Sequence, residues 1–222
     1  MIFFLSRFIT LLAISLTLTG CVTSTVDQMV FNAPAVSLNG DSVVILGRRH
    51  ASNYETEPDF IRCVGNYIGS HDRDITVIGE LEFLNTLYPW FEPRTAPLYP
   101  DDLIRLMQQV PVAQKMTELR TRYIIWIDGS TVRTDAAGSV ACGIGPGMAA
   151  CFGFGTWGHD SDYEATIWDF SQHAEVGRIN ATATGQSYMP AIVIPIPIIA
   201  PVQGTACDGV AEQLLQFLSS EH

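Results

Sequence analysis

Apolar residues in the first half of the chain follow two periods, one typical of buried strands and one typical of helices. Ser42–Leu46 has the pattern of a buried strand, and Pro58 begins a stretch with apolar residues at helical spacing. The predicted order is strand, helix, strand, helix and a longer helical stretch interrupted near Pro111, at Ser42–Leu46, Pro58–Gly69, Ile75–Ile78, Glu80–Leu87 and 101–119.

The second half is richer in predicted strands. A glycine-rich excursion, Ala136–Gly158, separates the first of them from the second, and a proline-rich apolar segment, Met189–Pro201, precedes the last element. Proline donates no backbone hydrogen bond, so this segment is expected to be an edge strand or an extended packed segment. Three strands and a C-terminal amphipathic helix are predicted at Tyr123–Ile127, Tyr163–Phe170, Glu175–Thr184 and Thr205–Leu218.

Together these elements predict one α/β (α+β) domain over residues 42–222. Strands and helices alternate before residue 120, which favours a sheet with helices packed on it. The last predicted strands follow one another through short turns, which favours an antiparallel meander. We therefore expect a mixed sheet, an antiparallel second half and a closing helix.

The N-terminal segment has the layout of a secretory signal. Arg7 precedes the apolar run Phe8–Leu18, and Leu18-Thr19-Gly20-Cys21 follows with small residues and a cysteine. This end resembles the lipobox of bacterial lipoproteins, which implies removal of residues 1–20 and acylation of Cys21, for example with palmitate. An uncleaved membrane span is the alternative.

The resemblance to lipoproteins also suggests a destination. In those families an Asp after the lipidated cysteine retains the protein at the inner membrane, and here that position is Val22. We therefore expect a protein anchored in the outer membrane and facing the periplasm. Residues 21–41 are rich in Thr, Ser and Asn, and they are predicted to form a flexible tether.

The charge of the chain excludes one class of partner. The sequence has 23 acidic and 12 basic residues, a net charge of −11. Such a surface repels phosphate backbones and anionic headgroups. Nucleic acid is therefore not an expected partner, and membrane attachment is expected to rest on acyl chains.

Assigning Cys21 to lipid leaves four cysteines, which an exported chain can oxidise. Cys142 and Cys151 flank a tip rich in glycine, and their pairing would leave Cys63 to pair with Cys207. Two other pairings remain open, as does a zinc site formed by Cys142, Cys151 and His159. Because the usual close pair of zinc-binding cysteines is missing, two disulfides are the favoured interpretation.

From Phe60 to Gly185 the order of elements resembles periplasmic domains of the TolB N-terminal-like and CsgG-like kind. The matching pieces include Pro58–Gly69, Ile75–Ile78 and the strand Arg122–Ile127 directly after a helix. Ala165–Phe170 and Glu175–Ile179 match that fold's meander. The resemblance implies an accessory or assembly role at the outer membrane, and it carries over no active-site residue.

Two polar clusters could bind small ions. Asp160, Asp162 and Glu164 alternate, so on a strand their carboxylates would share a face and could bind calcium; a solvated sheet edge is the alternative. Arg48–His50 follow the first strand at its carboxyl end, where α/β sheets place ligands. A surface loop balanced by nearby acidic residues is the alternative for these cations.

The glycine-rich excursion is the main candidate for an interaction site. Its apolar side chains are Met148, Phe152, Phe154 and Trp157. Exposed apolar area usually marks contact with a partner, so this tip and the proline-rich segment are expected to form a partner or oligomer interface. The alternative is that these side chains fold back onto the sheet.

No nucleophile motif, dinucleotide fingerprint or cofactor motif is present in the sequence, so no catalytic residue and no cofactor are predicted. The expected function is that of a non-enzymatic binding or assembly accessory in the cell envelope. A subunit of a CsgG-like secretion pore and a periplasmic hydrolase are the alternatives.

Overall fold

The structure is a computed structural model, and it describes residues 22–30, 38, 40–49, 55–92, 95–97 and 99–219. The predicted signal peptide, the lipidation site Cys21 and residues 31–37 of the predicted tether lie outside the described residues. The predicted strands and helices of the folded domain lie within them.

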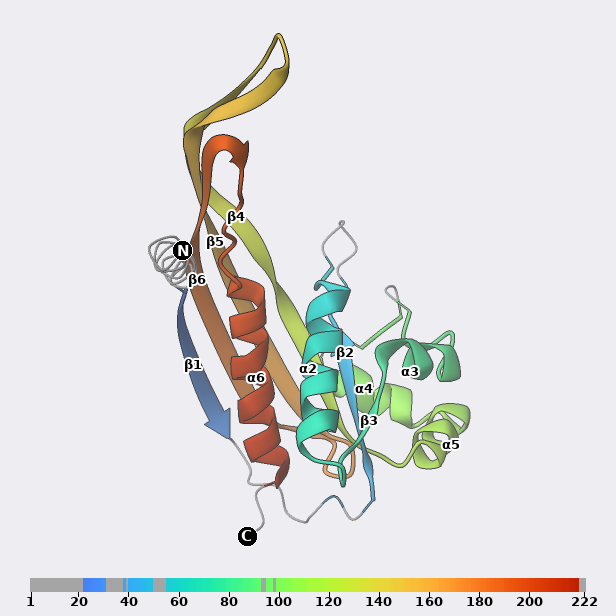
Figure 1. Cartoon of the computed structure of the whole chain (residues 1–222). Coiled ribbons are helices and arrows are strands. Elements are labelled where there is room, and N and C mark those ends of the chain that lie inside the picture. Colours follow the sequence, from blue (N-terminus) through green and yellow to red (C-terminus); the bar gives the residue numbers. More distant parts are fainter. Residues whose placement is uncertain are drawn as a thin grey trace, which may run out of the picture. The chain divides into compact units, whose positions relative to one another are not determined.

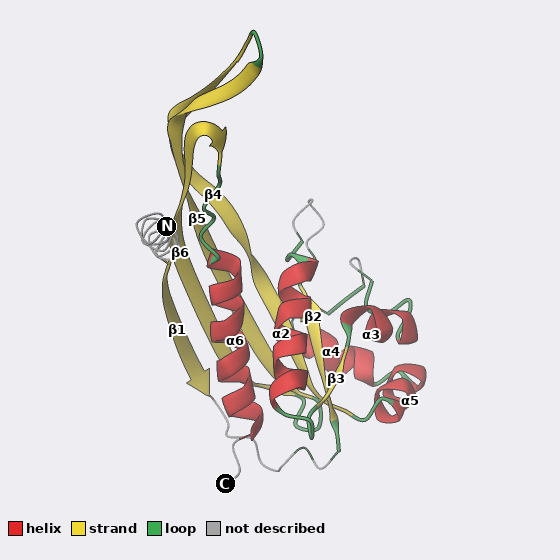
Figure 2. Cartoon of the chain, viewed as in Figure 1, coloured by secondary structure: helices red, strands yellow, loops and turns green. Residues whose placement is uncertain are grey.

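The fold is a mixed six-stranded sheet with helices, as the sequence predicts (Figures 1 and 2). The strand order is β1-β6-β5-β4-β2-β3, and β2 is parallel to both β3 and β4. The strands are β1 Val22–Val30, β2 Ser42–Gly47, β3 Thr76–Ile78, β4 Thr121–Gly145, β5 Met148–Asp169 and β6 Ala174–Pro195. The helices are α2 Pro58–His71, α3 Glu80–Thr86, α4 Pro100–Met107, α5 Val110–Glu118 and α6 Val202–Ser219.

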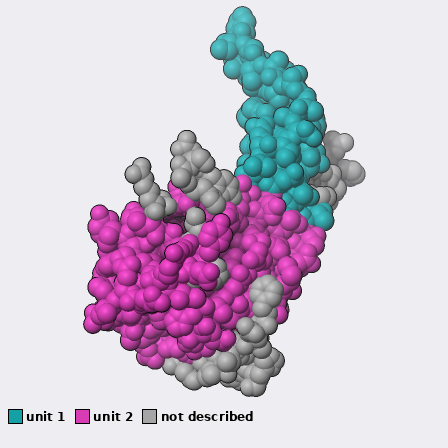
Figure 3. Space-filling model, turned by 180° about the vertical axis from the view of Figure 1, so that it is seen from behind, with its two compact units in different colours: residues 1–23, 131–160, 183–202 teal, residues 24–130, 161–182, 203–222 magenta. Residues whose placement is uncertain are grey.

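The chain forms two compact units, shown in Figure 3. Unit 1 contains residues 131–160 and 183–202 together with the N-terminal end through Thr23, and unit 2 contains the rest. The long strands β4, β5 and β6 therefore contribute residues to both units.

Unit 2 buries one face of the sheet under α3, α4 and α5. Side chains at alternate positions of β2 and β4, such as Leu46 and Trp126, point into this layer and are at most 4% exposed. They pack with a cluster from the helices and the following loop: Phe83, Leu87, Phe91, Leu103, Met107, Val112 and Met116.

The other face of the sheet in unit 2 packs against α2 and α6. The ring of Phe60 in α2 stacks on Tyr163 of β5 with ring centroids 3.5 Å apart. Phe217 of α6 meets Tyr123 of β4 edge to face at 5.8 Å. Unit 2 is therefore a three-layer arrangement in which the central strands are buried on both faces.

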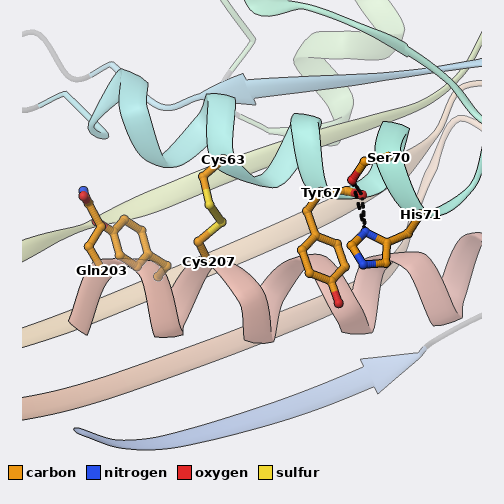
Figure 4. The surroundings of a disulfide bond; sticks show 7 residues. Cys63, Tyr67, Ser70, His71, Gln203 and Cys207 are labelled. Carbon is orange, nitrogen blue, oxygen red and sulfur yellow. Dashed lines mark hydrogen bonds between the residues drawn. A yellow bond between two sulfur atoms is a disulfide. The ribbon is translucent and has the colours of Figure 1, made fainter. Parts of the chain in front are cut away.

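A disulfide joins the two helices of that second face (Figure 4). Cys63 of α2 and Cys207 of α6 are bonded, with Cα atoms 6.3 Å apart, which confirms the predicted pairing. Farther along α2 the ring of Tyr67 stacks on His71 at 4.0 Å, where Figure 4 shows both beside α6. The closing helix is thus fixed covalently to the first helix of the domain.

The prediction of a flexible tether is wrong for residues 22–30, which form strand β1 beside β6. The sequence there is rich in Val and Thr, whose branched side chains suit a pleated surface. Within unit 2, Val26 lies above Gly209 of α6, where a Cβ would come within 2.6 Å of a Val26 methyl group. The absence of a side chain at Gly209 makes room for the edge strand.

We predict that replacing Cys63 and Cys207 with Ala lowers the stability of unit 2 by about 2–5 kcal/mol, because a bond across a long loop restricts the unfolded chain. Urea unfolding monitored by tryptophan fluorescence measures this, because three of the four tryptophans, Trp90, Trp126 and Trp168, lie in unit 2. The matched control removes Cys142 and Cys151, which lie in unit 1, and should leave that transition in place. Equal shifts of the unfolding transition in the two variants would contradict the assignment of this stabilisation to the bond between Cys63 and Cys207.

Candidate functional site

Strands β4 and β5 form a long hairpin closed by a two-residue turn at Pro146 and Gly147. Gly147 has a φ of 93°, which glycine adopts without steric cost. The excursion expected over Ala136–Gly158 is regular strand on both sides of this turn. At Gly153, φ is 143° and a Cβ would lie 2.2 Å from the Ser139 carbonyl oxygen, so only glycine fits there.

The second disulfide lies across the end of this hairpin, within unit 1. Cys142 of β4 and Cys151 of β5 are bonded, with Cα atoms 4.0 Å apart, as the sequence predicts. Because both sulfurs are consumed in the bond, they offer no thiolate to the zinc site considered with His159. The bond fixes the register of the two strands at the tip.

One face of the tip is an open apolar surface. Small residues line it on the β4 side, and Met148 and Phe152 on the β5 side are 65% and 60% exposed. The full lining is Ala141, Cys142, Gly143, Gly145, Met148, Ala150 and Phe152. The predicted alternative, in which these side chains fold back onto the sheet, is wrong for Met148 and Phe152.

The opposite face of the tip carries a single large side chain. Ile144 alternates with Gly143 and Gly145 along β4, so its side chain lies on the strand face opposite to those two positions. It is 92% exposed, the highest value among the described large apolar residues. The tip therefore exposes apolar side chains on both faces.

Phe154 and Trp157 are only partly available to a partner. Phe154 is exposed but has the ring of Tyr188 of β6 at 6.1 Å. Trp157 is half-buried, and the guanidinium of Arg133 lies 4.9 Å from its ring, a cation–π contact within unit 1. Of the four predicted interface residues, Met148 and Phe152 present the clearest free surface.

The proline-rich segment forms a second exposed apolar surface in unit 1. It folds back on itself: Ile198 and Tyr188 exchange backbone hydrogen bonds, and Ile196 N–H donates to the Pro190 carbonyl. Ile192 and Ile194, near the end of β6, are 79% and 68% exposed. The predicted extended strand is thus the end of β6 followed by a returning segment.

The carboxylates considered for calcium have other roles or face solvent. Glu164 binds Arg178 at 3.1 Å, and Arg178 also binds Glu175 at 2.8 Å. The hydrogen bond from Arg178 to Glu175 raises the pKa of this guanidinium. Asp160 and Asp162 are exposed. Among the described residues, only Cys63, Cys207 and Asp208 bring three potential metal ligands together, and the two sulfurs there form the disulfide.

Arg48, considered as an anion contact, is engaged inside the domain. Its guanidinium lies 4.2 Å from the ring centre of Trp126 and donates to the Pro97 carbonyl at 3.0 Å. Burial lowers the pKa of Arg48, and the carboxylates of Asp128 and Glu164 oppose that shift.

The neighbouring Arg49 pairs with two carboxylates. It lies 3.0 Å from Glu55 and 3.6 Å from Glu80. This arrangement matches the alternative of a surface loop balanced by acidic residues. His50 lies outside the described residues.

Comparisons with known proteins identify no family for the chain. No protein-family description and no curated protein matches it. Among solved structures it is similar to two PelC dodecamers from Paraburkholderia phytofirmans, each at 14% sequence identity, with TM-scores of 0.38 and 0.41. Each match covers 90% of this chain and 100% of the PelC chain. Within the described part of the chain, no helix has the length and apolar character needed to cross a membrane.

We predict that Phe152→Ser changes stability by less than about 1 kcal/mol, because the ring is mostly exposed. The variant should bind less of a dye that reports exposed apolar surface. Phe83→Ala is the matched comparison: that ring is fully buried, so its loss should cost about 3–5 kcal/mol. Strong destabilisation by Phe152→Ser would show that the ring packs inside the fold.

Proposed function

We propose that this protein is an outer-membrane lipoprotein, anchored through Cys21 and facing the periplasm, that acts as a non-enzymatic assembly component of the cell envelope. Its unit 1 associates with further copies of the chain or with a protein partner. The observation that carries this proposal is the exposed apolar surface of unit 1, formed by Met148, Phe152, Ile192 and Ile194.

The distribution of charge supports association at unit 1. Residues 136–158 and 179–207 contain no Asp, Glu, Lys or Arg, although the chain as a whole has a net charge of −11. Burying an uncharged apolar surface avoids the large desolvation penalty of a charge. Interface centres are depleted of charged residues for the same reason.

The position of β1 determines how far the proposed lipid on Cys21 would be from the sheet. The strand begins at Val22, directly after Cys21. A lipid on Cys21 would therefore be attached one residue from the sheet instead of at the end of a flexible tether. Val22 and Thr23 belong to unit 1, so in sequence the anchor adjoins the unit with the exposed apolar surface.

A second candidate function is that of a secretion-pore subunit whose hairpin enters the membrane. The specific observation in its favour is the same uncharged segment, 136–158, because lipid excludes charged side chains. Release of a dye trapped in phospholipid vesicles by the full chain would support this candidate. An assembly component that works in the aqueous phase would release none.

We predict that the full chain, purified in detergent, is oligomeric by light scattering. A combined Met148→Ser, Phe152→Ser and Ile194→Ser variant should shift it toward monomer because it removes apolar contact area. The control is Leu81→Ser, an equally apolar and exposed position in unit 2. The proposal would be contradicted if the wild-type chain were monomeric and captured no envelope protein in crosslinking.

We also predict that Cys21→Ala abolishes palmitate labelling and releases the protein from the membrane fraction, because an acylated thiol is the anchor. Labelling that survives the substitution would exclude this anchor. Outer- and inner-membrane fractions separated on a sucrose gradient locate the wild-type protein. Recovery with the inner membrane would contradict the outer-membrane assignment.

A further inference from the structure

We infer that β1, Val22–Val30, is a detachable strap. In its docked state it lies beside β6 at the edge of the sheet, and in its released state it becomes a flexible tether. The role of the strap in anchoring rests on the proposed acylation of Cys21, whereas its attachment to the sheet does not depend on a lipid.

Burial holds β1 far less firmly than it holds the central strands. Val22 and Val26 are half-buried, and the other seven residues of β1 are exposed. Its remaining large apolar side chains, Met29 and Val30, are 50% and 47% exposed. Every residue from Tyr123 to Ile127 in β4 is, by contrast, at most 4% exposed. Among the described strands, β1 alone contains no buried residue.

The two half-buried valines lie in places that glycine leaves open. A Cβ at Gly185 of β6 would lie 3.2 Å from a methyl group of Val22, and a Cβ at Gly209 of α6 would lie 2.6 Å from a methyl group of Val26. Neither glycine has a positive φ, so these positions require space and not an unusual backbone. Because glycine weakens the interior of a helix, Gly209 gives up helix stability for room beside Val26.

The backbone of β1 has one neighbouring strand. It is the edge strand of the sheet and lies next to β6 (Figure 1). It runs antiparallel to β6, because Val22 lies near Gly185 while the carbonyl oxygen of Met29 lies near Gly177. The buried apolar core contains no residue of β1. The strand can therefore leave the sheet while the core stays packed, as the least stable elements of a protein do in local unfolding.

Release of the strap changes the length of the link between the proposed anchor and the domain. The entropy of nine freed residues favours release, whereas the contacts with β6 and α6 favour docking. In the docked state the chain joins the sheet at Val22, one residue after Cys21. In the released state the nine residues of β1 span up to about 30 Å. A lipid on Cys21 thus holds the domain close to the bilayer only while the strap is docked.

Hydrogen exchange of the full chain in detergent, measured by mass spectrometry, tests the strap directly. Amides of β1 that face β6 should exchange at least about a hundredfold faster than those of Tyr123–Ile127, because they require only local opening. Gly209→Val occupies the place of the Val26 side chain and should accelerate exchange in β1 at least about tenfold more. Gly204→Val is the matched control, since it is exposed on the same helix and a Cβ there meets no atom within 4 Å.

A disulfide that locks the strap should have the opposite effect. A Cβ at Gly209 would lie 4.0 Å from the Cβ of Val26, which is within the range of a disulfide. Val26→Cys combined with Gly209→Cys should therefore join β1 to α6, and peptide mapping verifies this bond beside the two native ones. The locked chain should exchange the amides of β1 at least about tenfold more slowly than the wild type.

The inference is wrong if β1 of the wild type exchanges as slowly as Tyr123–Ile127 and neither the lock nor Gly209→Val changes its rate. That result would make β1 a permanent part of the sheet. Circular dichroism verifies that α6 remains folded in each variant, and the locked chain tests the inference even if Gly209→Val does not fold.

The effect on the anchor is tested with the lipidated protein in vesicles of phosphatidylethanolamine and phosphatidylglycerol. Energy transfer from the tryptophans to a dansyl-labelled lipid falls with distance, so it should be lowest for Gly209→Val and highest for the locked chain. Equal transfer in these variants, the wild type and Gly204→Val would show that release does not lengthen the link. If Cys21 takes up no palmitate, the proposed anchor fails, while hydrogen exchange still decides whether β1 detaches.

Discussion

The rest of the structure depends on the burial of β4 on both faces. Every residue from Tyr123 to Ile127 is at most 4% exposed, with alternate side chains under α2 and α6 on one face and under α3, α4 and α5 on the other. β4 pairs in parallel with β2, and its other neighbour in the sheet is β5. The parallel and antiparallel parts of the fold therefore meet at one strand, and that same strand continues along the chain to the hairpin tip.

The sequence predicted those parts of the fold in which the spacing of apolar side chains shows which of them are buried. The buried strand at Ser42–Leu46, the helix at Pro58 and the central strand at Tyr123 all have apolar patterns that the structure confirms. The disulfide pairs could also be predicted, because assignment of Cys21 to lipid left four cysteines and two of them flank a turn.

The parts that were missed are strands whose sequence carries no such pattern. Between Ala136 and Gly158 glycines and alanines dominate, so alternation of polarity is not visible, yet the backbones pair all the same. At Val22–Val30 the polar residues suggested a tether, although the valines and threonines suit a strand, and in the structure the segment pairs with β6. The contact of Arg48 with Trp126 could not be predicted for a related reason: it joins residues far apart in the chain.

Electrostatics explains why contact between copies would be confined to unit 1. Copies with a net charge of −11 repel one another, and at physiological salt that repulsion acts over about 8 Å. Unit 1 has charges only at Arg133, Asp135 and Asp160 among residues 131–160 and 183–202, so it is where two copies approach with the least repulsion. Most of the exposed large apolar side chains among the described residues lie in the same segments. Few charges and much exposed apolar area thus coincide in unit 1, and this coincidence supports the proposed association there.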